Sequence, residues 1–406
     1  MRVLVVNAGS SSLKHALVDS ATIARDPDGA VLAAGEERWE PGDSPGRHGE
    51  ALRAALRDAG GMGAAGGGAG GGGGGGDGEG GDARGGRGVR DGAPDAIGHR
   101  VVHGGARFAA PAAIDADVRA AIAEAAKLAP LHNRAALEGI DAALEAFPDL
   151  PQVACFDTAF HRTLDAAAAT CAVPRAWRER HGVRRYGFHG LNVEWCAGRA
   201  AELVGAAAAR RLVVCHLGGG CSATAVRDGR SCDTTMGLTP LDGIPMATRS
   251  GALDPGIVLL LEREAGLDAA AVDDALNHRS GLLGLAGSAD LRDVLAAAGR
   301  GEDDARLALA VFVRGIAGAV AALTTTLGGL DALVFTAGIG EHSPPLRAAV
   351  AARLAHLGVA LDRDRNERAA GDAEIGAEGA RIRVLTLRAR EELVVARQTA
   401  AALGGA

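Results

Sequence analysis

Short apolar runs alternate with stretches rich in alanine and leucine, and this alternation is the feature that most constrains the fold of the chain. The runs with the length and apolar character of buried strands are Val3–Val6, Val153–Phe156, Leu212–His216, Ala332–Thr336 and Ile382–Leu387. The stretches between them have the composition of helices, so the pattern predicts an α/β architecture. Because aromatic residues make up only 3% of the chain, Ala, Val and Leu must build most of the core.

A glycine-rich segment, residues 60–88, interrupts the alternation and cannot bury apolar surface. It follows a helix-like stretch at residues 50–60 and precedes a strand-like stretch at residues 95–105. We therefore predict a flexible surface insertion over residues 60–92 within one domain. Its matches to G-x-G-x-x-G arise from composition alone, and we assign it no phosphate-binding role.

Length and charge exclude several classes of protein. A chain of 406 residues favours two domains over one. The net charge of −7 argues against a nucleic-acid partner, whose binding would need a basic face. The sequence has no secretory h-region and no uninterrupted apolar span of bilayer length, so we expect no membrane segment. The most apolar stretch, which begins at Gly315, is interpreted as a core helix and its exit.

The six cysteines form no C-x-x-C pair and no zinc-ligand spacing. They are interpreted as buried, reduced thiols of a cytoplasmic protein. The chain also lacks the Walker A loop, because neither of its two lysines, Lys14 and Lys127, follows a glycine. With no H-R-D or D-F-G motif either, the sequence excludes both P-loop kinases and protein kinases.

Glycine-containing turns follow three of the strand-like runs, within residues 3–14, 213–226 and 333–343. Glycines at such turns let phosphate oxygens approach backbone N–H groups, and nearby hydroxyl or amide groups can hold phosphate or the water shell of a metal. Taken together, they predict two phosphate loops and a nucleoside loop that face each other across a cleft. Any one of them alone is more often just a tight turn.

Between these turns lie clusters of Arg and His, which also have ordinary interpretations. Arg100 and Arg249 could be surface charges, His132 and His189 could be hydrogen-bonded core histidines, and Asp157 could be a helix N-cap. The order of the motifs along the chain argues instead for a functional role of these residues. In chain order they are NAGSSSLK, GHRVVHGG, LAPLHN, FDTAFH, RRYGFHG, CHLGGGCS, DTTMGLTPLDG, TRSG, SGLLG, AGIGEHS and EELVVA.

This series resembles the acetate kinases and their propionate and butyrate kinase relatives, essentially from end to end. The resemblance implies an α/β, two-domain actin-like (ribonuclease H-like) ATPase fold with an active-site cleft between the domains. It implies an N-terminal domain of residues 1–157 plus 393–406 and a C-terminal domain of residues 158–392. The implied reaction is reversible, Mg²⁺-dependent transfer of the ATP γ-phosphoryl group to acetate, giving acetyl phosphate and ADP, in a cytoplasmic homodimer. Mn²⁺ can stand in for Mg²⁺.

The resemblance also implies roles for five catalytic residues. A carboxylate must approach a polyanionic phosphate, so cations and hydrogen-bond donors must surround the transferring group. Arg100 and Arg249 match the paired arginines that hold the acyl carboxylate and the phosphoryl group. His189 matches the donor to the equatorial oxygens, and His132 matches a second histidine nearby. Asp157 is an acidic member that lies near Mg²⁺ or fixes an arginine. The attacking carboxylate is already ionised near neutral pH, so no general base is assigned.

Further residues are implied for substrates and metal. The metal ligands are Asn7 and Glu391, although Glu392 is an alternative to Glu391. The acyl pocket is formed by Arg100, Val102, Leu131, Phe188 and Pro240. The nucleotide and its phosphates contact Ser10, Ser12, Lys14, His216, Gly218, Gly219, Gly220, Asp290, Leu291, Arg292, Gly338, Ile339, Gly340 and His342.

Three positions depart from the family pattern. Gly219 replaces an asparagine beside the phosphates, His342 replaces an asparagine near the adenine, and Arg390 stands beside the proposed metal ligand. Two alternatives to an acetate kinase therefore stay open. One is a propionate or butyrate kinase, since a small apolar pocket discriminates by only about 1–3 kcal/mol per methylene. The other is a catalytically weak ATP-binding protein of the same fold.

Overall fold

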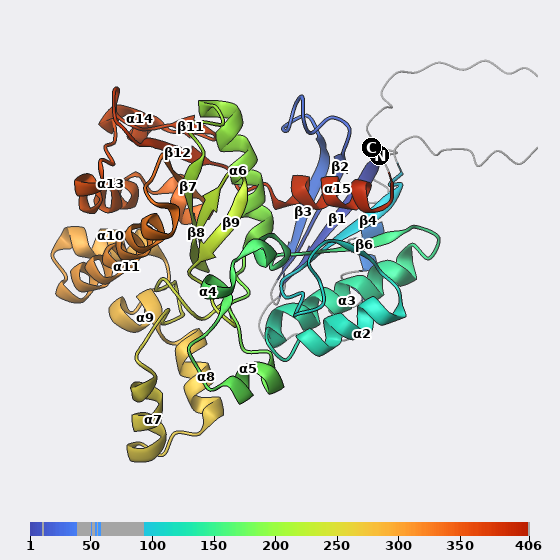
Figure 1. Cartoon of the computed structure of the whole chain (residues 1–406). Coiled ribbons are helices and arrows are strands. Elements are labelled where there is room, and N and C mark those ends of the chain that lie inside the picture. Colours follow the sequence, from blue (N-terminus) through green and yellow to red (C-terminus); the bar gives the residue numbers. More distant parts are fainter. Residues whose placement is uncertain (10–11, 39–49, 51–52, 55, 58–92, 405–406) are drawn as a thin grey trace, which may run out of the picture.

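The computed structural model describes residues 1–9, 12–38, 50, 53–54, 56–57 and 93–404. These residues form two mixed α/β domains, each built on a six-stranded sheet (Figure 1). The predicted α/β fold with two domains is confirmed. The predicted insertion at residues 60–92 lies outside the described residues.

The first sheet has the order β3-β2-β1-β4-β6-β5. Strands β1 and β2 pair antiparallel, as do β2 and β3, whereas β1, β4 and β6 run parallel to one another and β5 pairs antiparallel with β6. The strands are β1 (Arg2–Ala8), β2 (Ser12–Asp19), β3 (Val31–Arg38), β4 (Ala96–Val101), β5 (Ala112–Ala113) and β6 (Gln152–Phe156).

The second sheet repeats this topology in the order β9-β8-β7-β10-β12-β11. Strands β7, β8 and β9 form an antiparallel meander, β7, β10 and β12 are parallel, and β11 pairs antiparallel with β12. The strands are β7 (Arg211–Leu217), β8 (Cys221–Arg227), β9 (Arg230–Thr234), β10 (Ala332–Thr336), β11 (Ala373–Glu374) and β12 (Arg383–Leu387). The two domains are therefore structural duplicates.

Helices cover both faces of each sheet. They are α2 (Ala116–Ala125), α3 (Pro130–Ala146), α4 (Ala166–Ala169), α5 (Arg175–His181), α6 (Gly190–Val204), α7 (Pro255–Glu264), α8 (Ala269–His278), α9 (Gly281–Ala286), α10 (Leu291–Arg300), α11 (Asp303–Leu327), α12 (Ala337–His342), α13 (Pro344–Arg353), α14 (Arg363–Arg368) and α15 (Glu391–Ala402), with 3₁₀ turns η2 (Ala159–Thr163) and η3 (Ala355–Leu357).

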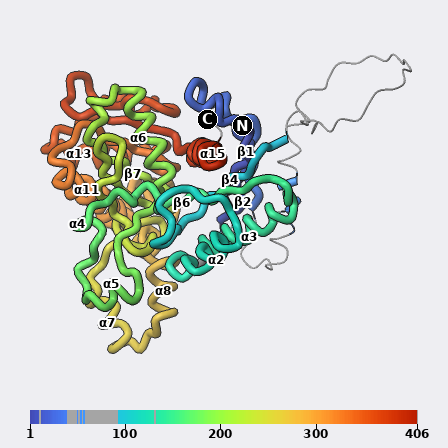
Figure 2. The backbone as a smooth tube through the Cα atoms, turned by 45° about the vertical axis from the view of Figure 1, so that its right-hand side comes forward, coloured from blue at the N-terminus to red at the C-terminus, as the bar shows by residue number. Residues whose placement is uncertain are grey.

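Strand β1 shows how the core is divided between the two faces of its sheet. Successive side chains of a strand point to opposite faces. Leu4 and Val6 pack toward α3, whereas Val3 and Val5 join a second cluster that includes α6 and α15. That second cluster also contains side chains of the other sheet, so α6 and α15 fill the space between the domains (Figure 2).

The long helix α11 is apolar enough to cross a bilayer by length and composition alone. In the fold it packs on β7 and β8, and it buries Phe312, Ile316, Val320 and Leu323 at helical spacing. The interpretation of the stretch from Gly315 as a core helix is confirmed.

Candidate active site

A cleft of about 800 Å³ opens between the two sheets and is lined by residues of both. Of the residues singled out in the sequence, it brings together Asn7, Ser12, Lys14, Arg100, Val102, His132, Asp157, Phe188, His189, His216, Gly220, Pro240, Arg249, Gly338 and Glu391. Ser10 lies outside the described residues, and so does the side chain of Leu131.

The first sheet contributes its residues from adjacent strand ends. Because β1, β4 and β6 are parallel, their carboxyl ends meet at one edge of the sheet, which is where ligands bind in open α/β sheets. Asn7 stands near the end of β1, Arg100 near the end of β4, and Asp157 directly after β6.

Arg100 is held on three sides at this edge. Its Nη2 and Nε donate to Asp157 Oδ2 and Oδ1 at 2.6 and 3.2 Å. Its Nε also lies 3.1 Å from Glu391 Oε2, and its Nη1 donates to Asn7 Oδ1 at 3.3 Å. Two carboxylates thus neutralise one guanidinium and leave an excess of negative charge.

Burial and charge shift the pKa values of this group. Burial lowers the pKa of Arg100, but attraction to Asp157 and Glu391 outweighs burial and the net shift is upward. Burial, reinforced by the neighbouring Glu391, raises the pKa of Asp157 although Arg100 opposes the shift. Burial likewise raises the pKa of Glu392, which follows Glu391 in α15 and also lines the cleft.

The second sheet contributes a pair of stacked histidines. The rings of His189 and His216 lie parallel with centroids 3.8 Å apart. His189 is in the left-handed backbone region at the start of α6, and its Nδ1 is 2.9 Å from Ser222 Oγ. Asn192 donates its side-chain amide to His216 Nδ1 at 2.9 Å, so the neutral His216 ring carries its proton on Nε2.

Three of the histidines that line the cleft, His132, His189 and His216, are kept neutral. Burial, followed by repulsion from Arg249 and Arg100, lowers the pKa of His132 to about 4. Burial and then repulsion from Arg100 lower the pKa of His216 to about 4 as well. The pKa of His189 falls well below its usual value because of burial and the adjacent His216. These rings can therefore donate hydrogen bonds at neutral pH, but they do not store a proton.

Arg249 also lines the cleft and has no ion-pair partner within the described part of the chain. Its Nη1 donates only weakly, to Pro240 O at 3.4 Å and to Met246 Sδ at 3.8 Å. Burial lowers its pKa. A partly buried guanidinium without an acidic neighbour is a ready site for an anion.

The glycine at 220 has a steric reason in this arrangement. A Cβ at Gly220 would lie 3.3 Å from Arg249 Nη1 and 3.5 Å from His189 Nε2. Glycine at this position therefore leaves the guanidinium and the imidazole room to approach the same ligand, and a Cβ would press on the guanidinium.

Some predicted nucleotide contacts do not line the cleft. These are Gly218, Gly219, Asp290, Leu291, Arg292, Ile339, Gly340 and His342. Asp290 caps α10 by accepting from the backbone N–H of Arg292 and pairs with the Arg292 guanidinium, while Leu291 is in the core. His342 Nδ1 is 3.0 Å from Gly338 O. Contact of these residues with a nucleotide stays a prediction.

Sequence reasoning missed several residues of the site. Asn192 fixes the His216 tautomer, Ser222 orients His189, and Glu341 lines the cleft and accepts from the Ala389 N–H at 2.9 Å. Ser222 and Glu341 fall inside the CHLGGGCS and AGIGEHS motifs, so the signal was present. Glu36 also lines the cleft, but β3 carries no motif that would have revealed it.

Comparison with solved structures agrees with this geometry. The structure resembles acetate kinase from Porphyromonas gingivalis, with a TM-score of 0.82, 33% identity and 99% of each chain covered. It also resembles a propionate kinase from Francisella tularensis, with a TM-score of 0.82, 34% identity and 98% of each chain covered. The duplicated sheets and the cleft between them define a two-domain ATPase of the actin-like fold.

Sequence comparison narrows the class to a family. Residues 91–397 match the Acetokinase family. The chain is 46% identical to acetate kinase of Deinococcus deserti, over 98% of this chain and 97% of that protein. It is 44% identical to acetate kinase of Leifsonia xyli subsp. xyli over the same shares. The chain belongs to the acetokinase family.

Proposed function

We propose that the protein is an acetate kinase, which transfers the γ-phosphoryl group of ATP reversibly to acetate and yields acetyl phosphate and ADP. An acetate oxygen forms the new P–O bond while the bond from the γ-phosphorus to the bridging oxygen breaks, and ADP leaves with the electron pair. Full-length similarity to acetate kinases supports the assignment.

The observation that carries the proposal is Arg249. It is a partly buried cation in the cleft without an acidic partner among the described residues, and Gly220 leaves space beside it. A protein that only binds nucleotide does not need such a group. We assign Arg249 to the transferring phosphoryl group and the incoming carboxylate.

The neutral histidines surround the same space as donors. His189 and His216 face the cleft as a stacked pair, and His132 lines it from α3. Donors aimed at the equatorial phosphoryl oxygens stabilise charge where it develops, and loss of one such donor typically costs about 10²–10³ in turnover. We assign His189 this role and His132 a supporting one.

The acidic side of the cleft fits Mg²⁺. Asp157, Glu391 and Asn7 supply oxygen ligands with an excess of negative charge, and burial together with the neighbouring Glu391 raises the pKa of Asp157. Among the described residues no group of three His, Cys, Asp or Glu side chains forms a closed metal site. This suits an ion that takes one or two carboxylates and completes its shell with phosphates and water. When bound, Mg²⁺ would neutralise the phosphates of ATP; Mn²⁺ has compatible ligand chemistry.

The acyl pocket is assigned to Val102, Phe188 and Pro240, which line the cleft beside Arg249. Ser12, Lys14 and Gly218–Gly220 are assigned to the phosphates, and Gly338 with the start of α12 to the nucleoside. The propionate kinase from Francisella tularensis shares this fold, so propionate is the alternative acceptor.

We further propose a homodimer in the cytoplasm. Helix α7 buries none of its residues in the protomer and exposes Ile257, Leu259 and Leu260. An apolar face of this kind is typical of a subunit interface. The six free cysteines suit a reducing compartment. Light scattering of the wild type and of Leu259→Glu would test the proposed homodimer. We expect the wild type to be a dimer and the introduced charge to weaken its association. A monomeric wild type would contradict the proposal.

We propose the domain division at residues 157/158 and 392/393. In support, α15 packs against β1, β4 and β6 of the first sheet although it follows the second sheet in the chain.

The test of function traps acyl phosphate with hydroxylamine in a reaction of purified protein, ATP and Mg²⁺ with acids from formate to butyrate. We expect the highest kcat/KM with acetate. His189→Ala, purified in the same way, controls for host enzymes and should be nearly inactive. A maximum at propionate would replace the assigned acceptor, and no product with any acid would contradict the proposal.

A further inference from the structure

A buried histidine outside the catalytic group holds together the walls of the acyl pocket. His103 has no exposed surface and directly follows Val102, after the end of β4. It does not line the cleft, and the mechanism above does not use it.

The backbone and the tautomer of His103 are both fixed. Asn133 accepts from the His103 N–H at 3.0 Å and donates to the His103 carbonyl at 2.9 Å. The Gly105 N–H donates to His103 Nδ1 at 2.9 Å. The neutral ring therefore carries its proton on Nε2, which donates to Leu238 O at 3.3 Å. Burial lowers the pKa of His103 to about 4, so the ring is neutral at physiological pH.

His103 is linked to each described wall of the pocket, directly or through a neighbouring residue. Val102 is its chain neighbour, and Phe188 packs against it edge-on with ring centroids 5.4 Å apart. Leu238, which accepts its hydrogen bond, lies two residues before Pro240. Val102 directly follows β4 of the first sheet, while Phe188 and Pro240 belong to the proposed C-terminal domain.

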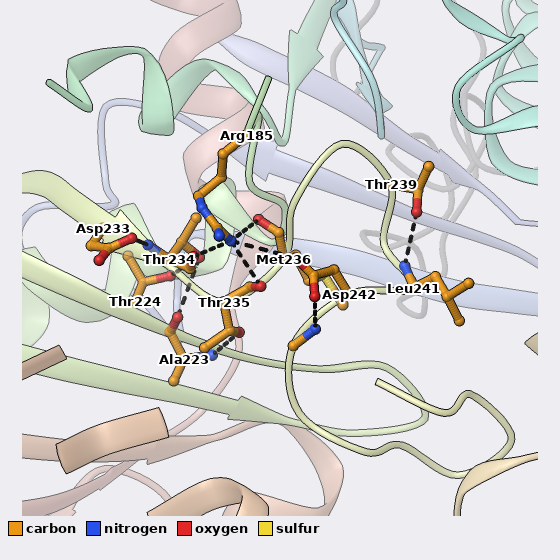
Figure 3. Close-up of polar contacts among 11 residues, drawn as sticks. Arg185, Ala223, Thr224, Asp233, Thr234, Thr235, Met236, Thr239, Leu241 and Asp242 are labelled. Carbon is orange, nitrogen blue, oxygen red and sulfur yellow. Dashed lines mark hydrogen bonds and ion pairs between the residues drawn. The ribbon is translucent and has the colours of Figure 1, made fainter. Parts of the chain in front are cut away.

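The segment that carries Leu238 and Pro240 is anchored independently at its start. Figure 3 shows Arg185 with its Nη1 directed at three successive carbonyls, those of Thr234, Thr235 and Met236. The distances are 2.9, 3.0 and 3.4 Å. Beyond this start, the carbonyl of Gly237 accepts from the Tyr186 N–H at 3.0 Å, that of Leu238 from His103, and that of Pro240 from Arg249. His103 is thus the contact that ties this segment to the strand end that carries Val102.

We propose that His103 is a positioning residue that sets the width of the acyl pocket and thereby the preferred chain length of the carboxylate. This inference rests on the proposed function, because it concerns the acceptor of that reaction.

Two substitutions separate the contributions of His103. His103→Ala removes both the ring packing and the hydrogen bond to Leu238, whereas His103→Phe keeps a ring against Phe188 but cannot donate. We expect the ratio of kcat/KM for propionate to that for acetate to rise about tenfold in His103→Ala and less in His103→Phe. His103→Gln, which keeps a donor, should stay nearer the wild-type ratio.

The matched control is His99→Gln. His99 is also buried and lies four positions earlier in β4, but it bonds Gln152 rather than a pocket wall. This variant should lose stability without a change in the acid ratio. If a general loss of stability changed the acid ratio, His99→Gln would change it as much as His103→Ala does, and this would overturn the proposal. Unchanged ratios in folded His103→Ala and His103→Phe would overturn it as well.

A measurement on the wild-type protein tests the proposal even if the His103 variants do not fold. ¹⁵N NMR of the wild-type imidazoles should show His103 as the Nε2-protonated tautomer without titration above about pH 5. A charged or Nδ1-protonated ring would overturn the proposal. Wild-type activity with an unchanged ratio in the variants refutes only this inference, whereas an inactive wild type refutes the proposed function and this inference with it.

Discussion

The two halves of the molecule share one strand order but bring different chemistry to the cleft. At the first sheet, β1 and β2 present polar side chains such as Asn7 and Ser12, and Arg100 is neutralised by Asp157 and Glu391. At the second sheet, the turn between β7 and β8 consists of glycines 218–220. Beside that turn stand neutral histidines and an arginine with no acidic partner in the described chain.

The two copies of this duplicated fold therefore have different functions at the same cleft. Both turns are closed by a backbone hydrogen bond, from Gly9 N to Ser12 O at 2.7 Å and from Gly218 N to Gly220 O at 3.1 Å. The scaffold is thus alike, and the charges differ. The acidic half suits a metal ion, and the half that contains Arg249, unpaired among the described residues, suits the phosphoryl group and the carboxylate.

The largest expected effect on stability comes from breaking the neutralised side. Asp157→Asn removes one of the two carboxylates that neutralise Arg100, while Glu391 still pairs with it. The unfolding free energy should fall by about 2 kcal/mol, because the charge-assisted hydrogen bonds from Arg100 to the Asp157 carboxylate are lost at a buried site. Urea unfolding measures this. Asp141→Asn, which breaks the surface pair with Arg119, is the control and should cost less than about 1 kcal/mol. Equal losses in the two variants would show that Asp157 does not neutralise a buried charge.

Crowding the free-cation side should have the next largest effect. Gly220→Ala puts a methyl group 3.3 Å from Arg249 Nη1, so we expect turnover to fall about tenfold with little change in stability. Gly219→Ala is the matched control, because a Cβ there meets nothing within 4 Å. If both variants kept full turnover, Arg249 would not need the space beside Gly220.

Acid should weaken the fold through its buried histidines. The folded pKa of about 4 for His216 lies below the usual value of 6.5, so the unfolded state binds more protons between these values. Stability is therefore full above about pH 6.5 and is lost as pH falls toward 4. We expect about 1 kcal/mol lost per buried histidine between pH 7 and 5.5. His216→Gln should therefore reduce the loss of unfolding free energy between pH 7 and 5.5 by about 1 kcal/mol, as measured by urea unfolding at several pH values. An identical pH dependence would mean that folding does not lower the pKa of His216.

The smallest effect sharpens the comparison of the two turns. Gly219→Asn restores a side chain that the family pattern has at this turn, and it enters open space without left-handed strain. We expect the KM for ATP to fall about threefold, because the asparagine side chain would add one hydrogen bond to the phosphates. Initial rates at varied ATP measure it, with Gly219→Ala as control. A rise in KM would mean that the turn needs its glycine.

The sequence predicted the central parallel strands well, because buried strands are continuous apolar runs. All five predicted strands are present, as β1, β6, β7, β10 and β12. The edge strand β3 was missed because it is largely exposed and ends in Gly-Glu-Glu-Arg, which breaks the apolar pattern. Such a strand is defined by its partner rather than by its own residues.

The site was predictable where motifs converge and was not where contacts depend on tertiary packing. Arg100, Asp157, His189 and Arg249 do meet at one cleft, as the resemblance implied. Arg100 is paired by Asp157 after β6 and by Glu391 at the start of α15, whereas Arg249 has no acidic partner among the described residues. The sequence does not show that these two similar arginines lie in opposite environments.

The division of charge between the halves is tested most directly by Arg249→Met, measured for both turnover and unfolding. Because Arg249 has no acidic partner in the described chain, its removal strands no opposite charge. We expect turnover to fall at least about a thousandfold while the unfolding free energy is unchanged or higher. Retained turnover, or a loss of stability as large as that of Asp157→Asn, would contradict it.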